Sequence, residues 1–77
     1  MYSYSICTEP DHEIFTRQCE ALEKNIPGLV KVEKLEDVDG SQIQVYKLGL
    51  QEISVYNSYY VGAVYIESEV DLEKYFL

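Results

Sequence analysis

The sequence is poor in basic residues, histidine and cysteine, and it contains no tryptophan. Six lysines and arginines stand against fourteen acidic residues, and the formal net charge is −8. A charge of this sign repels nucleic-acid phosphates and anionic membrane surfaces. We therefore expect no nucleic-acid partner and no membrane partner, whereas the charge is compatible with a basic protein partner.

Long apolar runs are also missing. No stretch approaches the roughly 18 apolar residues that cross a bilayer. The opening residues, MYSYSICTEPDHE, lack the basic start and the apolar run of a secretory signal. Two cysteines are fewer than a small secreted domain usually carries, so Cys7 and Cys19 are expected to be free thiols in a reducing cytoplasm. A Cys7–Cys19 disulfide is the alternative.

Known patterns of catalytic and cofactor sites are absent as well. The chain has no phosphate-binding glycine loop, no dinucleotide-binding glycine pattern and no H-E-x-x-H motif. Cys7, His12 and Cys19 supply at most three of the four ligands of a structural zinc site. Free cysteine usually packs in a core, so both cysteines are interpreted as packing residues. We expect neither an enzyme nor a cofactor.

What the chain does contain is the pattern of one small α+β domain over residues 1–77. Its apolar share of 47% is typical of a globular protein. Hydrophobic periodicity predicts the element order β-α-β-β-β-β-α. The predicted strands are 2–7, 29–38, 41–50, 52–56 and 60–67, and the predicted helices are 8–26 and a short one within 68–77. We expect a mainly antiparallel sheet of four or five strands, with the long helix packed on one face.

The long helix is predicted from an apolar stripe and from capping residues. The stripe consists of Phe15, Cys19, Leu22 and Ile26, at spacings of four, three and four. Thr8 and Asp11 form a variant of the capping box, and Pro10 suits a first helical turn. The helix is therefore expected to begin at Thr8.

A second, short helix is predicted in the segment SEVDLEKYFL, residues 68–77. Ser68 and Asp71 repeat the pattern of a helix start. Leu72 and Phe76 are four residues apart, so their side chains are expected to meet on one side of the helix. This helix is expected to cover part of the sheet face that the long helix leaves open.

The stretch LEDVDGSQIQVY looks at first like part of a calcium-binding loop, because Asp37, Asp39 and Gly40 form D-x-D-G. An EF-hand loop in this register needs carboxylates at its first and last positions, which are Leu35 and Tyr46. The EF-hand is therefore excluded. A type I turn that starts at Asp37 and ends in a left-handed Gly40 is predicted instead, between two strands.

This turn sets the expected register of the first hairpin. The expected opposite pairs are Leu35 with Ile43, Val32 with Tyr46, and Val30 with Leu48. In that register one face carries Val30, Val32, Tyr46 and Leu48, and the other carries Leu35, Ile43 and Val45. Both faces then carry apolar side chains and one helix covers only one of them, so we predict a two-fold homodimer.

Acidic residues and tyrosines are the features that indicate binding. Eight of the 77 residues are tyrosine, a type enriched at protein interfaces as well as in packed strands. Glu52 is expected beside the last acidic residues if strands 52–56 and 60–67 pair. The predicted partner-binding residues are Glu67, Glu69, Asp71, Glu73, Tyr56, Tyr59 and Tyr60. They predict a small acidic, non-enzymatic binding module of the inhibitor, immunity or adaptor type that receives a basic protein.

A weak calcium site is the alternative function. The candidate ligands are Glu36, Asp37 and Asp39 at the turn, or Glu67, Glu69 and Asp71 near the last helix. Calcium takes about six to eight oxygen ligands, so two or three carboxylates completed by water would bind it only at about millimolar concentration.

Overall fold

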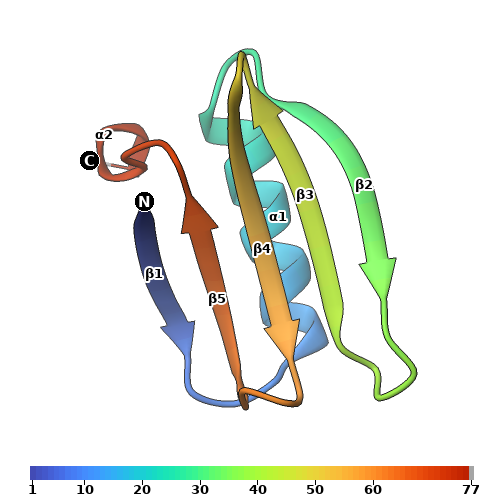
Figure 1. The fold of residues 1–77 in the computed structure, drawn as a ribbon. Coiled ribbons are helices and arrows are strands. Elements are labelled where there is room, and N and C mark those ends of the chain that lie inside the picture. The colour runs from blue at the N-terminus through green and yellow to red at the C-terminus, as the bar shows by residue number, and fades with distance from the viewer. Residues whose placement is uncertain (77) are drawn as a thin grey trace.

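Five strands and two helices make up the fold, in the order predicted from the sequence (Figure 1). The computed structural model describes residues 1–76, with the side chains of residues 1–75. The strands are β1 (Tyr2–Cys7), β2 (Val30–Glu36), β3 (Gln42–Leu48), β4 (Gln51–Ser58) and β5 (Ala63–Ser68). The helices are α1 (His12–Asn25) and α2 (Glu73–Phe76). The α+β class is therefore confirmed.

The five strands form one sheet in the order β1-β5-β4-β3-β2, and every pair of neighbours is antiparallel. From β2 to β5 the chain is a meander, because consecutive strands are neighbours. The first strand, β1, instead lies beside the last one, β5. The connection through α1 therefore carries the chain from one edge of the sheet to the other (Figure 1).

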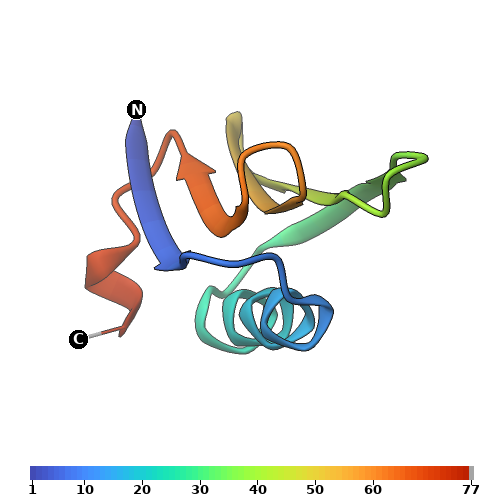
Figure 2. The ribbon, with the colours of Figure 1, turned by 90° about the horizontal axis from the view of Figure 1, so that it is seen from below.

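Both helices lie on the same side of the sheet (Figure 2). Val70 and Leu72, which precede α2, are buried in the same core as the residues of α1. The backbone N–H of Leu72 donates to the hydroxyl of Tyr4 at 2.9 Å, which holds this segment on the helix side of β1. The prediction that the C-terminal helix covers the second face is therefore wrong. We call that second face the open face.

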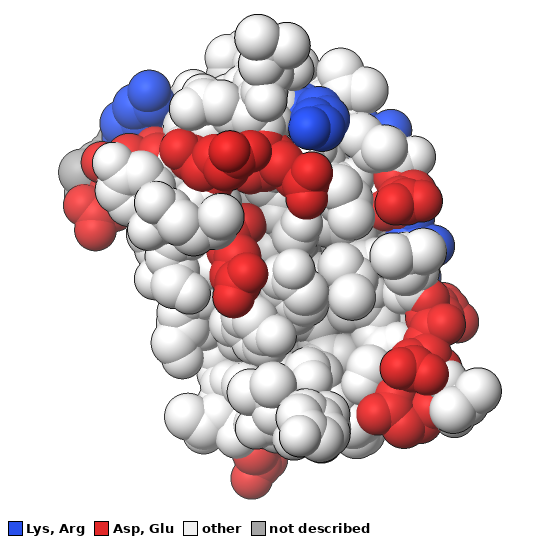
Figure 3. Space-filling model, in the orientation of Figure 1, with Lys and Arg blue, Asp and Glu red and all other residues white. Residues whose placement is uncertain are grey.

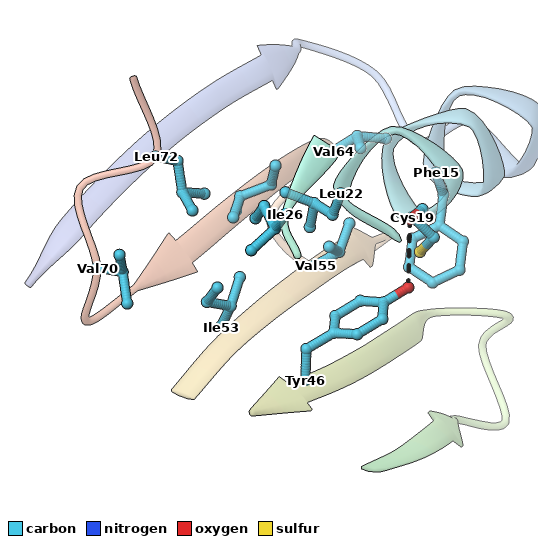
Figure 4. Close-up of a cluster of buried hydrophobic side chains, with 11 residues drawn as sticks. Phe15, Cys19, Leu22, Ile26, Tyr46, Ile53, Val55, Val64, Val70 and Leu72 are labelled. Atoms are coloured by element: carbon cyan, nitrogen blue, oxygen red, sulfur yellow. Dashed lines mark hydrogen bonds between the residues drawn. The ribbon is translucent and has the colours of Figure 1, made fainter. Parts of the chain in front are cut away.

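The core lies between α1 and the sheet, and the predicted apolar stripe of the helix is confirmed (Figure 4). The buried apolar residues are Phe15, Cys19, Leu22, Ile26, Tyr46, Ile53, Val55, Val64, Ile66, Val70 and Leu72. Leu22 is fully buried at the centre of the stripe, and burial of a leucine contributes about 1.5–3 kcal/mol.

The long helix begins later than predicted, at His12 and not at Thr8. Asp11 is the N-cap: its carboxylate accepts the N–H of Ile14 at 3.1 Å. The N–H of Asp11 donates to the side-chain oxygen of Asn57 at 3.0 Å. Asn57 lies near the end of β4, and its contact with Asp11 fixes the start of the helix. Local capping patterns cannot predict this contact, because the two residues are 46 positions apart in the sequence.

The C-terminal helix also begins later than predicted, at Glu73. Ser68 is the last residue of β5 and is fully buried, so it does not cap the helix. Asp71 does have a capping contact, because its carboxylate accepts the N–H of Glu73 at 3.1 Å. The predicted packing of Phe76 on Leu72 lies outside the described side chains.

The first hairpin has the predicted turn but not the whole predicted register. The N–H of Gly40 donates to the carbonyl of Asp37 at 3.1 Å, and Gly40 has a φ of 90°, as a left-handed turn end requires. Leu35 pairs with Ile43 as expected. Beyond that pair a β-bulge between Lys31 and Glu33 shifts the register by one residue.

The bulge overturns the two other predicted pairs. Tyr46 pairs with Lys31, where Val32 was expected, and Val30 pairs with Lys47, where Leu48 was expected. The shift puts Lys31 on the helix side of the sheet, where its ammonium group lies 3.5 Å from the Glu23 carboxylate. Val30 moves to the open face instead of joining the core.

Both cysteines are free thiols, as predicted: Cys19 is buried and Cys7 is partly buried. Burial raises the pKa of the Cys19 thiol, so it stays protonated at neutral pH. Among the described residues, the helices are too short or too polar for any of them to cross a membrane.

Candidate functional site

The open face is defined by the alternation of side chains along the strands. Ile53 and Val55 of β4 point into the core, so Ser54 and Tyr56 between and after them point the other way. Strand pairing extends this face across the sheet. Its main members are Leu35, Ile43, Val45, Glu52, Ser54, Tyr56, Tyr65 and Glu67. Figure 3 shows this face, with acidic groups across its upper part and down its right-hand side, one acidic group nearer the centre, and uncharged residues over most of the rest.

The centre of the open face is an apolar row that crosses four strands. Leu35 pairs with Ile43, Ile43 with Tyr56, and Tyr56 with Tyr65. The rings of Tyr56 and Tyr65 are stacked, with centroids 4.7 Å apart and planes 7° from parallel. Aromatic pairs of this kind stabilise a fold by about 0.5–1.5 kcal/mol beyond the effect of burial. The stacking therefore helps to hold the two tyrosine rings of the row in place.

The electrostatics of the row keep Tyr65 neutral. Burial raises the pKa of Tyr65, and the neighbouring charge of Glu67 raises it further. Both effects disfavour the phenolate. The row therefore offers hydroxyl groups and ring faces to a partner at neutral pH, and the negative charge is confined to the carboxylates around it.

Three of these carboxylates form what we call the acidic cluster: Glu52, Glu67 and Glu69. They line one shallow hollow together with Met1, Ser54 and Tyr56. The carboxylate of Glu69 accepts the N–H of Glu52 at 2.7 Å, and the N–H of Glu69 donates to the carbonyl of Glu52 at 3.0 Å. The expectation that Glu52 lies beside the later acidic residues is therefore confirmed.

Lys47 is a basic side chain that approaches the acidic cluster. The ammonium group of Lys47 lies 3.5 Å from the carboxylate of Glu52, and both side chains are nearly half exposed. An exposed pair of this kind contributes little to stability. The single charge of Lys47 also offsets only part of the charge of the three carboxylates.

Asp71 and Glu73 do not belong to the acidic cluster, although they follow it closely in the sequence. After β5 the chain turns at Ser68, whose buried hydroxyl accepts the N–H of Val70 at 2.9 Å. Asp71 then accepts a hydrogen bond from the hydroxyl of Tyr4 at 3.3 Å. Glu73 lines a cavity on the helix side of the sheet. The four predicted acidic residues are thus divided between the two faces.

The three predicted tyrosines also occupy different places. Tyr56 lies in the apolar row of the open face. Tyr59 packs its ring on Gly40 and donates its N–H to the hydroxyl of Ser41 at 2.9 Å, so it joins the two turns at this end of the sheet. Tyr60 is 94% exposed in the turn between β4 and β5.

The carboxylates of the first hairpin stabilise their own turn. Asp37 accepts the N–H of Val38 at 2.7 Å, and Asp39 accepts the N–H of Ser41 at 2.9 Å. The hydrogen bond from Ser41 lowers the pKa of Asp39. Glu36 is paired with Lys34 at 3.5 Å. Across the described residues, no three acidic, histidine or cysteine side chains are grouped closely enough to hold a metal ion.

Tyr65 is the member of the site that sequence reasoning missed. Its partner Tyr56 was singled out, but the pairing of the two depends on the register of β4 with β5, which places Tyr56 opposite Tyr65. The alternating pattern of residues 63–68 is the signal that could have assigned Tyr65 to the same face.

Comparison of the chain with models of known protein families, with curated proteins and with solved structures found no match to any of them.

Proposed function

We propose that this protein is a small non-enzymatic binding module whose open face receives a basic protein. The observation that supports this most directly is a sheet face without a helix, with an apolar row at its centre and the acidic cluster at its margin. The functional types that we propose are an inhibitor, an immunity protein or an adaptor. The two free thiols support a reducing compartment, and we infer the cytoplasm.

The two parts of the surface have different physical roles. Tyr56 and Tyr65 are large, stacked and only partly buried, so a partner that covers them removes apolar area from water. The acidic cluster attracts positive charge over a distance of about 10 Å at ordinary ionic strength. It therefore accelerates the encounter with a basic partner and discriminates against an acidic one.

The test is recovery of a partner from cell extract by the immobilised protein, followed by native mass spectrometry. We expect a basic protein that binds at low salt and is released at high salt, because screening removes the attraction of the acidic cluster. Recovery that is insensitive to salt, or recovery only of acidic proteins, would contradict the proposal.

A matched pair of variants separates the open face from the overall charge. Glu52→Gln with Glu67→Gln neutralises two members of the acidic cluster, whereas Glu13→Gln with Glu20→Gln neutralises two exposed residues of α1. Both double variants lose two negative charges. The first should lose the partner and the second should keep it; equal loss in both would show that only total charge matters.

A further inference from the structure

The two edges of the sheet differ in how well they are protected against pairing with another strand. At one edge, all seven residues of β2 are exposed, and four are charged. A β-bulge also interrupts β2. Charges and bulges are the usual means by which proteins block an exposed edge. This edge is therefore poorly suited to receive an additional strand.

The β1 edge has neither kind of protection over most of its length. Tyr2 to Ile6 carry no charged side chain and no proline. The four residues from Tyr2 to Ser5 pair with β5 in regular register, and the bulge comes only before Cys7. In the described part of the chain, the backbone of Tyr2 to Ile6 makes no hydrogen bond beyond those to β5. Its outward N–H and C=O groups are available.

A hollow lies on each side of β1. On the helix side, Tyr4, Ile6, Ile66 and Leu72 line an apolar cavity of about 200 Å³ between α1 and the segment before α2. On the open face, a second and shallower hollow runs beside β1. It is lined by Ser3, Ser5, Val61, Tyr65 and Glu67, among others. Side chains of an added strand alternate between the two faces, so both hollows would be used.

Each hollow has an acidic residue in its wall. Glu67 lines the hollow on the open face, and Glu73 lines the one on the helix side. Asp71 lies near β1 and accepts a hydrogen bond from the hydroxyl of Tyr4. Lys74 is the basic residue of this segment, and its ammonium group lies over the ring of Tyr75, 5.3 Å from the ring centroid. Carboxylates therefore lie on both faces of the sheet next to β1.

We propose that β1 is a docking edge for a basic, extended segment of the partner, which adds to the sheet as a sixth strand. Backbone hydrogen bonds to β1 would supply affinity, and the two hollows with Glu67 and Glu73 would select apolar and basic side chains. This inference rests on the proposed function and specifies how the partner is held. We assign the edge to a basic segment, not to a second copy, because each copy carries a charge of −8.

The test uses an end-capped fluorescent peptide of alternating lysine and valine, titrated at low salt and followed by anisotropy. Glu67→Gln and Glu73→Gln should each weaken binding about two- to fivefold, because each removes one exposed charge contact. Glu36→Gln at the opposite edge removes the same charge and should change affinity less than either.

Two further measurements report the backbone contact itself. The same peptide methylated on two adjacent central amide nitrogens keeps its charge but cannot pair along either edge. It should bind at least about tenfold more weakly, because the methyl group that faces β1 removes one hydrogen bond and its bulk keeps the two strands too far apart for the neighbouring ones. Hydrogen exchange of the β1 amides should slow when the unmethylated peptide is added, whereas exchange of the β2 amides should not change.

The outcomes separate this inference from the proposed function. If only Glu67→Gln weakens binding and the methylated peptide binds equally well, the partner lies on the open face; the docking edge is then wrong and the proposed function stands. Failure of the peptide to bind also overturns the docking edge. Concentration-dependent protection of β1 in the protein alone would assign the edge to a second copy. The proposed function fails only if the salt- and charge-dependent recovery of a partner fails.

Discussion

Removing one oxygen atom from the core tests how α1 is held on the sheet. Tyr46 is fully buried, and its hydroxyl donates to the carboxylate of Glu23 at 2.6 Å. The carbonyl of Cys19 lies 3.5 Å from the same hydroxyl (Figure 4). Tyr46→Phe deletes these contacts and keeps the ring, so it changes the hydrogen bonds without opening a large cavity.

The size of the effect follows from the surroundings of Glu23. A hydrogen bond to a charged group contributes about 1.5–3 kcal/mol. The side chain of Glu23 is 41% exposed and lies 3.5 Å from Lys31, so its carboxylate can be solvated after the hydroxyl is lost. We therefore expect Tyr46→Phe to lower the free energy of unfolding by about 1–2 kcal/mol at pH 7, near the lower end of that range.

The same bond predicts a change in alkaline stability. Burial, followed by the hydrogen bond to Glu23, raises the pKa of Tyr46 far above the usual value of a tyrosine. The folded protein then keeps this proton at a pH where the unfolded chain has lost it. Its contribution is complete below about pH 10 and falls as the pH rises further, by up to about 1.4 kcal/mol per pH unit.

Urea denaturation of the wild type and of Tyr46→Phe between pH 7 and pH 11 measures both effects. The variant should lose stability less steeply in alkali, although Tyr4 and Tyr65, whose pKa values are also raised, keep part of the slope. Glu23→Ala alone and combined with Tyr46→Phe completes a double-mutant cycle. Additive losses together with parallel alkaline slopes would refute the reasoning.

Three other perturbations have expected outcomes. Gly40→Ala should lower the free energy of unfolding by about 1–2 kcal/mol, because φ is 90° and the new Cβ would lie 3.3 Å from the ring of Tyr59; unchanged urea denaturation would contradict this. Asn57→Ala should cost about 2–3 kcal/mol in the same assay, since it removes two bonds and leaves the buried side chain of Gln42 with one partner fewer; a loss below about 1 kcal/mol would speak against it. In sedimentation at micromolar concentration, the fraction of the predicted homodimer should rise with salt, because screening reduces the repulsion between two acidic copies. A monomer at every protein and salt concentration would rule out the homodimer.

Predictability from sequence was best where the determining contacts are local. The spacing of Phe15, Cys19 and Leu22 identifies the buried side of α1, because helical geometry alone brings these residues together. The turn that ends at Gly40 was equally predictable, since a few neighbouring residues supply its hydrogen bonds. Such features depend on no distant part of the chain.

The errors share a different cause, which is contact between distant residues. Thr8 and Asp11 are both suitable helix caps, and the side chain of Asn57 favours Asp11 by accepting its N–H. The register of the first hairpin shifts at a bulge, and the shift lets Lys31 reach Glu23 on the helix. In each case the local pattern allowed two solutions, and tertiary structure selected the one that the pattern favoured less.

The candidate site shows the same limit. Glu67 and Glu73 are close in the sequence, and any reading of the charge alone places them in one patch. The buried turn at Ser68 separates them onto two faces of the sheet. Composition therefore supports only a proposal about the type of partner, whereas the place where that partner would bind depends on how one short segment passes around the end of β5.

The pairing of the first strand with the last has a consequence for biosynthesis. Residues 2–7 leave the ribosome before the rest of the sheet, but they pair with residues 63–68, which are made much later. The contacts between α1 and the meander of β2 to β5 are nearer in sequence, so that part of the fold can form first. Until β5 is made, β1 is an unpaired strand without charges to protect it. When chains are made close together, β1 of one chain can complete the sheet of another, and rapid expression should therefore increase the yield of strand-exchanged dimers.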